Sequence, residues 1–185
     1  MAESFGHPIA TPAAVLAFWR EAGSDRWFTR DEAFDAEVRD KFLPTYEAAV
    51  AGRLFWEATA EDALALVIVL DQFPRNMFRG DPKCFASDPL ARAAANRALK
   101  RGYDQDVAEN ERQFFFLPFM HSEELVDQDR CVQLYREAES ADLKYAEQHR
   151  DIIRRFGRFP YRNAMLGRDT TPEEQKFLDD GGFKG

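Results

Sequence analysis

Long apolar runs, cysteine and histidine are all scarce in this chain of 185 residues. No apolar run approaches the roughly 20 residues that cross a bilayer, so we expect no membrane span. The N-terminal stretch lacks a basic region followed by an apolar region, which argues against a secretion signal. Two isolated cysteines, Cys84 and Cys131, are typical of reduced thiols. These features favour a cytoplasmic protein.

Metal and cofactor signatures are also missing. The chain has three histidines, His7, His121 and His149, and contains no CxxC or HExxH motif. It contains no GxSxG, P-loop or GxGxxG motif either. We therefore expect neither a metal site nor a cofactor. A formal net charge of -8 argues further against nucleic acid or an anionic membrane as a partner.

Helical patterns run through the whole chain. Hydrophobic residues make up 45% of the sequence, and its 17 phenylalanines predict a core rich in aromatic contacts. No convincing strand or tight hairpin turn is found. The sequence therefore predicts one all-α domain over residues 1–185, with about nine helices packed as irregular antiparallel pairs. Residues 1–10 are expected to form a loosely ordered lead-in, and residues 181–185 a frayed tail.

The stretch 63–80 is the centre of the predicted fold. Residues 63–70 are all apolar, and Thr59 before them is typical of a helix cap. A helix that is apolar on every side must be covered on every side. We expect four of its residues to be almost fully buried: Leu66, Val67, Val69 and Leu70. Pro74 is expected to end the helix at Phe73 and to begin a turn that carries two arginines and an asparagine.

Capping residues and prolines outline the other helices. The first should begin with Thr11 and Pro12 and stop before Gly23, and an aromatic loop with Trp27 should follow it. Further helices are expected over 31–42 with a break or kink at Pro44, from there to Gly52, from Ser87 or Asp88 to Gly102, and over 111–119, 122–138, 141–156 and 171–178.

A short motif at the end of the central helix occurs twice. Residues 73–76 read FPRN and residues 159–163 read FPYRN, each after an apolar helix. The chain uses 19 arginines but only six lysines, and arginine is preferred for bidentate recognition of carboxylate and phosphate. We therefore predict an anion-binding pocket, with His121 at its edge, formed by residues that lie near one another: Arg75, Asn76, Arg162 and Asn163.

The candidate ligand-binding residues follow from the two copies of this motif. The full set is Asp71, Arg75, Asn76, Arg79, His121, Arg158, Arg162 and Asn163. Asp71 lies in the last turn of the central helix, where its charge opposes the helix dipole, so it should have a cationic partner such as Arg75. The structural alternative is that Asp71 and main-chain carbonyls satisfy every one of these guanidinium groups.

The residues themselves leave three functions open. The preferred one is the binding of a small anionic ligand at an arginine-lined pocket, without a commitment to catalysis. A groove between stacked helix pairs would instead bind a protein or an acidic peptide. The third is a hydrolase-type enzyme with His121 as general acid or base. His149 lies on an apolar stripe and is predicted to be a core histidine. The sequence does not indicate the oligomeric state.

Three stretches resemble the markers of the domain-of-unknown-function 924 family: LALVIVLDQFPRNMFRG, ERQFFFLPFMHSE and HRDIIRRFGRFPYRNAMLGR. The resemblance extends in order over nearly the whole chain. It implies an all-α, tetratricopeptide-repeat-like fold in a mostly bacterial family, and no established activity. The third stretch of the family reads FPHRN, whereas this chain has Tyr161 at the position of the histidine. Any role of that histidine as a base or ligand is not carried over, although tyrosine can still donate a hydrogen bond.

Overall fold

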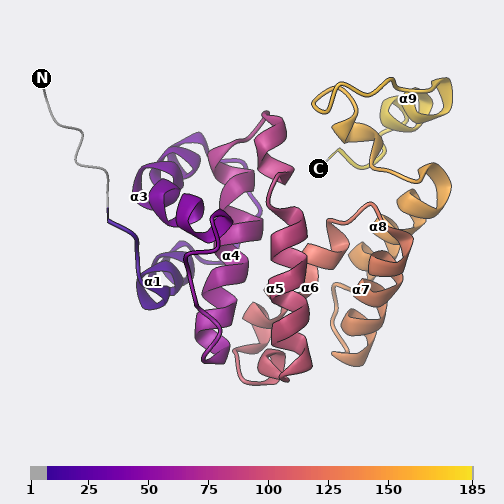
Figure 1. Cartoon of the computed structure of the whole chain (residues 1–185). Helices are drawn as coiled ribbons and strands as arrows, with labels where there is room; N and C mark the ends of the chain where they lie inside the picture. Colours follow the sequence, from indigo (N-terminus) through magenta and orange to yellow (C-terminus); the bar gives the residue numbers. More distant parts are fainter. Residues whose placement is uncertain (1–7, 185) are drawn as a thin grey trace, which may run out of the picture. The chain divides into compact units, whose positions relative to one another are not determined.

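The structure, a computed structural model, describes residues 8–184, so His7 lies outside it. Within that range the chain forms helices and no strand (Figure 1). The elements in order are α1 (Pro12–Ala22), α2 (Ser24–Trp27), α3 (Glu32–Val50), α4 (Ala60–Met77), η1 (Pro82–Phe85), α5 (Asp88–Lys100), η2 (Tyr103–Gln105), α6 (Glu109–Met120), α7 (Leu125–Glu137), α8 (Leu143–Phe156), η3 (Pro160–Arg162) and α9 (Pro172–Asp179). The predicted all-α class is confirmed for these residues. None of the helices they form has both the length and the apolar composition of a membrane span.

Contacts between residues divide the chain into two compact units, Met1–Phe115 and Phe116–Gly185. Helices α1 to α5 belong to the first unit, and α7 to α9 belong to the second. Helix α6 begins in the first unit and ends in the second. Each unit has buried hydrophobic residues of its own. The expected single domain therefore stays a prediction.

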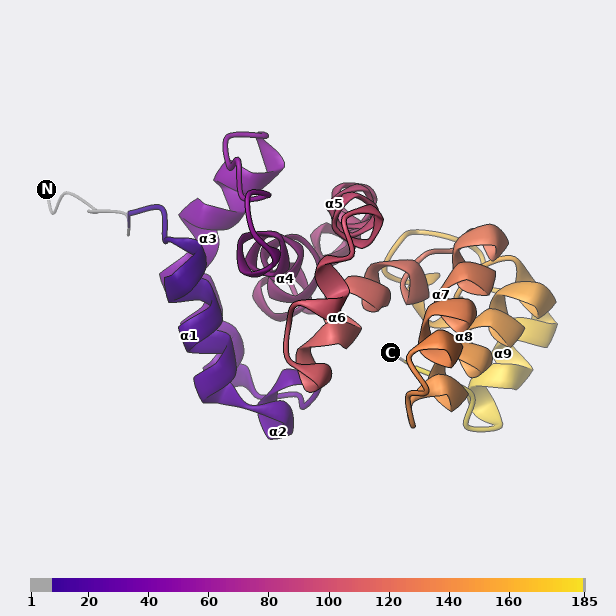
Figure 2. The same ribbon diagram turned by 90° about the horizontal axis from the view of Figure 1, so that it is seen from below.

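Helix α4 forms the centre of the first unit. Its cap is Thr59, whose hydroxyl accepts a hydrogen bond of 3.1 Å from the backbone amide of Asp62. Figure 2 looks nearly along α4, with α1 and α3 on one side and α5 on the other. The residues predicted to be buried are exposed by 5% or less: Leu66 5%, Val67 0%, Val69 0% and Leu70 3%. The prediction of a covered central helix is confirmed.

Two prolines lie inside helices, where the sequence predicted a break or kink at Pro44 and the end of a helix before Pro74. Pro44 is inside α3, and Pro74 is inside α4. A proline removes one backbone hydrogen bond and crowds the preceding turn. In α4, however, Phe73 and Met77 on either side of the proline are fully buried, and their burial favours a continuous helix. The predicted break at Pro74 is wrong, and Arg75 lies on the helix and not in a turn.

Two other helix starts, those of α1 and α9, follow the predicted capping residues. The hydroxyl of Thr11 accepts a hydrogen bond from the amide of Ala14 at the start of α1. At the start of α9, Thr171 and Glu174 form a reciprocal capping box. These caps confirm two starts that the sequence places at Thr-Pro pairs.

Aromatic rings fill the core of the first unit. Trp19 is fully buried and stacks on Trp27, with ring centroids 5.9 Å apart, and its ring also meets Phe34, Phe73 and Phe114. The stretch with Trp27, predicted as a loop, forms the short helix α2. The indole nitrogen of Trp27 donates a hydrogen bond of 2.7 Å to the carbonyl of Trp19, which holds α2 against α1.

The second unit contains a hydrophobic cluster at the end of α8 and in the segment after it. Its buried members are Ile152, Ile153 and Phe159. Phe183 near the C-terminus packs against this cluster and is partly buried by it. At Phe183 the chain therefore does not form the frayed tail that the sequence predicts, because packing against the cluster removes the apolar ring from water.

Shortening two leucines of α4 tests its central position. Leu66→Ala and Leu70→Ala should each lower the free energy of unfolding by about 2–5 kcal/mol, because each opens a cavity in a packed core. Leu90→Ala is the control, since Leu90 is 42% exposed and its loss should cost no more than about 0.5 kcal/mol. Urea unfolding followed by circular dichroism measures all three. Losses below about 1 kcal/mol at both core positions would mean that α4 is not central.

Candidate functional site

Arg75 and Asp71 lie in the last turns of α4. Two guanidinium nitrogens of Arg75 donate to the two carboxylate oxygens of Asp88 in α5, at 2.9 and 3.1 Å. The same guanidinium donates to the main-chain carbonyl of Asp71 at 2.7 Å and lies 3.4 Å from its carboxylate. Asp71 is 1% exposed, and the cationic partner that the sequence predicts for it is present. Arg75 thus joins α4 to α5.

Asp35 of α3 binds the other polar residues at this helix end. Arg79 donates to both of its carboxylate oxygens, at 2.5 and 2.9 Å. The side-chain amide of Asn76 donates to the same carboxylate at 2.8 Å. The hydrogen bond to Asp35 raises the pKa of the Arg79 guanidinium, and burial opposes this effect only in part. The three residues join α4 to α3.

Glu174 is the corresponding carboxylate of the second unit. It is 3% exposed and accepts two hydrogen bonds from Arg158, at 2.6 and 2.9 Å. The side-chain amide of Asn163 adds a third at 3.2 Å, and the backbone amide of Thr171 a fourth at 2.8 Å. The hydrogen bond from Arg158 is the largest cause that lowers the pKa of Glu174 to about 2. Glu174 is therefore ionised at neutral pH.

Glu123 holds a second arginine of this unit. Arg168 donates to its two carboxylate oxygens at 2.7 and 3.0 Å, and the backbone amide of Phe159 donates at 2.8 Å. Arg168 also donates to the side-chain oxygen of Asn163 at 3.0 Å. Burial by itself would raise the pKa of Glu123, but the hydrogen bonds from Arg168 and Phe159 outweigh it and lower the pKa. These contacts fix the segment between α8 and α9.

Arg162 lies in the interior of the second unit and is 4% exposed. One of its terminal guanidinium nitrogens donates to the main-chain carbonyl of His121 at 3.0 Å, and its Nε donates to the hydroxyl of Tyr161 at 3.0 Å. The guanidinium carbon lies 4.6 Å from the centroid of the Phe159 ring. A cation over an aromatic face is stabilised by the ring quadrupole. Hydrogen bonds and ring therefore hold this guanidinium in one orientation.

His149 is buried beside the same group and is 8% exposed. Its ring centroid lies 5.7 Å from that of Phe159 and 4.4 Å from that of Phe183, and its Nδ1 lies 2.7 Å from the carbonyl of Tyr145. The pKa of His149 is lowered to about 4, chiefly by burial and to a smaller extent by His121 and Arg162, against the effect of the Tyr145 carbonyl. The position agrees with the prediction of a core histidine.

The predicted site residues fall into two groups. Those in the first unit are Asp71, Arg75, Asn76 and Arg79, and those in the second are His121, Arg158, Arg162 and Asn163. The two copies of the motif also differ in backbone, because the first lies in α4 and the second contains the whole of the short helix η3. A single pocket that joins the two groups stays a prediction. Within residues 8–184, no three histidine, cysteine or carboxylate side chains are placed to hold a metal ion.

The acidic partners of the arginines were missed in the sequence. They are Asp35, Asp88, Glu123 and Glu174. The only sequence signal for these partners is the excess of acidic residues, since the chain has 33 aspartates and glutamates against 25 lysines and arginines. Glu174 also belongs to the capping box at the start of α9, a role that it has in addition to binding Arg158.

The family model that matches this chain is described as a bacterial protein of unknown function, DUF924, and it covers residues 15–182. The chain belongs to this family. A solved structure, of the protein of unknown function ATU0120 from Agrobacterium tumefaciens, is 48% identical, with a TM-score of 0.89 over 92% of this chain and 97% of that chain. A search of curated proteins gives no match. The resemblance seen in the sequence is confirmed, and the tetratricopeptide-like detail stays a prediction.

The buried His149 should make stability depend on pH. Its pKa is about 4 in the folded protein against 6.5 as the ordinary value, so the unfolded chain takes up a proton first as the pH falls. Between these two pH values the protein should lose up to about 3 kcal/mol of unfolding free energy. His149→Asn, which can still donate to the Tyr145 carbonyl, should flatten this dependence. Urea unfolding across this pH range measures both proteins, and equal slopes would contradict the expectation.

Proposed function

We propose that the protein binds a small anion, a phosphate or a carboxylate, at Arg162 in the second unit. One observation carries the proposal: the buried guanidinium is held between the Tyr161 hydroxyl and the His121 carbonyl, over the ring of Phe159. A guanidinium that is already held in one orientation loses little freedom when a ligand binds. It also presents a planar fork of donors that matches carboxylate and phosphate oxygens.

Tyr161 and His121 would supply the remaining hydrogen bonds. Both side chains are partly exposed, so the approach to Arg162 would lead past them. The Tyr161 hydroxyl accepts from Arg162 and still has its own proton to donate to an anion oxygen. The imidazole of His121 can donate as well, and its hydrogen bond is stronger when it is protonated. Binding at this site requires no chemical step.

Three other predicted arginines have a structural role in this proposal. Arg75, Arg79 and Arg158 each donate two hydrogen bonds to a single carboxylate. An incoming anion would have to replace a partner of the same charge and the same two-bond geometry. The displaced buried carboxylate would then cost several kcal/mol. We therefore assign these arginines to the fold.

Thermal unfolding with three probes tests the anion site: inorganic phosphate, succinate and a glutamate tetrapeptide. A ligand that binds only the folded state raises the midpoint, by about 2.7 kcal/mol of stability at 100 times Kd. We expect at least one probe to raise the midpoint of the unaltered protein. Arg162→Lys and Tyr161→Phe should lose most of that rise, because the first removes the planar guanidinium and the second removes the hydroxyl that binds it. The rise of each variant is measured against its own midpoint without ligand.

Arg154→Ala is the matched control, since Arg154 belongs to the same unit and is 49% exposed in its pair with Asp129. It should keep the full rise. A response to the tetrapeptide but not to the two small anions would identify an acidic peptide as the ligand. The proposal is wrong if no probe raises the midpoint, or if Arg162→Lys and Tyr161→Phe keep the rise.

A further inference from the structure

An open pocket of about 650 Å³ lies within the first unit and includes none of the residues of the proposed anion site. Its walls come from the end of α1, from α2, from the start of α4 and from the start of α6 with the loop before it. The residues that matter for its chemistry are Arg20, Trp27, Glu61, Asp106, Asn110 and Glu111. The volume is within the range of about 300–1,000 Å³ that small-molecule sites occupy.

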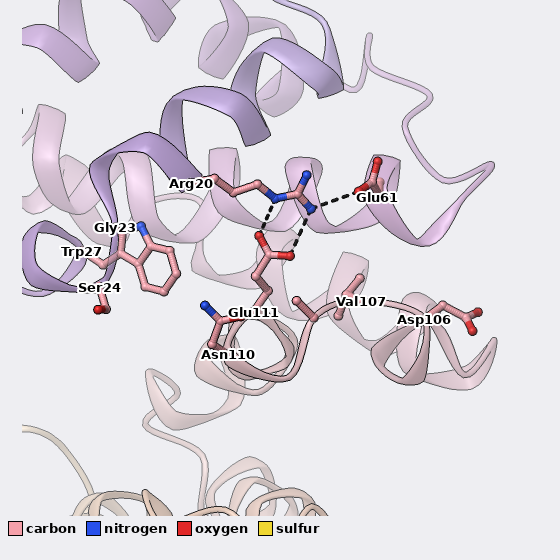
Figure 3. A pocket seen from close by; sticks show the side chains of 10 residues that line it. Arg20, Gly23, Ser24, Trp27, Glu61, Asp106, Val107, Asn110 and Glu111 are labelled. Carbon is pink, nitrogen blue, oxygen red and sulfur yellow. Dashed lines mark hydrogen bonds and ion pairs between the residues drawn. The ribbon is translucent and has the colours of Figure 1, made fainter.

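An ion pair divides this pocket. Arg20 donates to both carboxylate oxygens of Glu111, at 2.6 and 3.0 Å, and to Glu61 at 3.0 Å. In Figure 3 this pair is drawn between Trp27 on one side and Glu61 and Asp106 on the other. The hydrogen bond to Glu111 raises the pKa of Arg20, so the guanidinium keeps its charge at any ordinary pH. Glu111 is 3% exposed and forms a fixed anion in the wall.

Negative charge exceeds positive charge in this pocket. Three carboxylates, those of Glu61, Asp106 and Glu111, line it together with the single guanidinium of Arg20, so two negative charges are in excess. Glu61 and Glu111 lie in the first turns of α4 and α6, where the helix dipole favours them. That preference explains their position in the sequence but leaves the pocket itself anionic.

Asp106 and Asn110 add further hydrogen-bond acceptors to the pocket. The carboxylate of Asp106 and the amide of Asn110 are exposed, and neither takes part in a hydrogen bond or ion pair within residues 8–184. Glu61 is 63% exposed and is bound on one side only, by Arg20. Hydrogen-bond acceptors that face an open pocket in this way are available to a ligand.

We propose that this pocket binds a small organic cation that carries two ammonium groups. Two ammonium groups neutralise the two excess charges. Glu61 and Asp106 accept hydrogen bonds from them, and the carbonyl oxygen of the Asn110 side chain accepts another. The carbon chain between the ammonium groups lies against the apolar part of the wall on the same side of the ion pair, to which Val107 belongs. An anion is excluded by the same carboxylates.

Isothermal titration calorimetry at low ionic strength tests this inference with 1,4-diaminobutane as the probe. The unaltered protein should give saturable binding of one diamine. Glu61→Gln and Asp106→Asn should each weaken binding by roughly two- to fivefold, as expected for exposed charge pairs, and the double variant by roughly tenfold. Salt should weaken the binding, since the charges involved are exposed.

Glu32→Gln is the matched control, because Glu32 also lies in the first turn of a helix of this unit, α3, and is 86% exposed outside the pocket. It should bind the diamine with unchanged affinity. Far-UV circular dichroism checks that each variant is folded. The neutral 1,4-butanediol should give no saturable heat. The inference is overturned if the diamine does not bind, if the diol binds equally well, or if the double variant keeps the affinity of the unaltered protein.

Discussion

In each of the two units, pairs of a carboxylate and an arginine hold the helices and the segments between them in place. In the first unit Asp88 and Asp35 each bind an arginine from the end of α4, and so join that helix to α5 and α3. In the second unit Glu174 of α9 binds Arg158, and Glu123, in the loop before α7, binds Arg168, so both carboxylates hold the segment between α8 and α9. A buried charge without its partner would cost several kcal/mol, so each pair depends on both members. The apolar run of α4, residues 63–70, can be followed by charged residues because these pairs neutralise that end of the helix.

Local patterns in the sequence are sufficient to predict the helices, because a helix and its caps depend on neighbouring residues. The cap at Thr59 and the buried run after it are examples. The prediction at Pro74 was wrong because the cost of a proline is local, whereas the burial that outweighs it comes from other helices. The partners of the arginines are also distant in sequence: Arg79 and Asp35 are 44 residues apart. No local pattern identifies such a pair, so the arginines predicted to bind ligand include several that hold the fold.

The two proposed sites use opposite charges in the same way. At Arg162 a cation is held in place by neutral oxygens and an aromatic ring, which prepares it for an anion. In the pocket beside Arg20, carboxylates exceed the one guanidinium, which prepares it for a cation. At Arg162, and at Glu61 in the pocket, a partner on the protein restricts the orientation of the charged group before any ligand arrives, and this reduces the entropy lost on binding. The net charge of -8 is a sum over the whole chain and does not give the local charge at either site.

Side-chain NMR of the arginines tests most directly the claim that Arg162 binds ligand while Arg75 and Arg79 hold the fold. The Nε–H resonances of a nitrogen-15-labelled sample are assigned with single arginine-to-lysine variants and are then followed during titrations with inorganic phosphate and with succinate. The account predicts that the Arg162 resonance shifts and saturates with at least one of the two anions, whereas the resonances of Arg75 and Arg79 stay in place. A saturable shift of Arg75 or Arg79, with Arg162 unchanged, would contradict it.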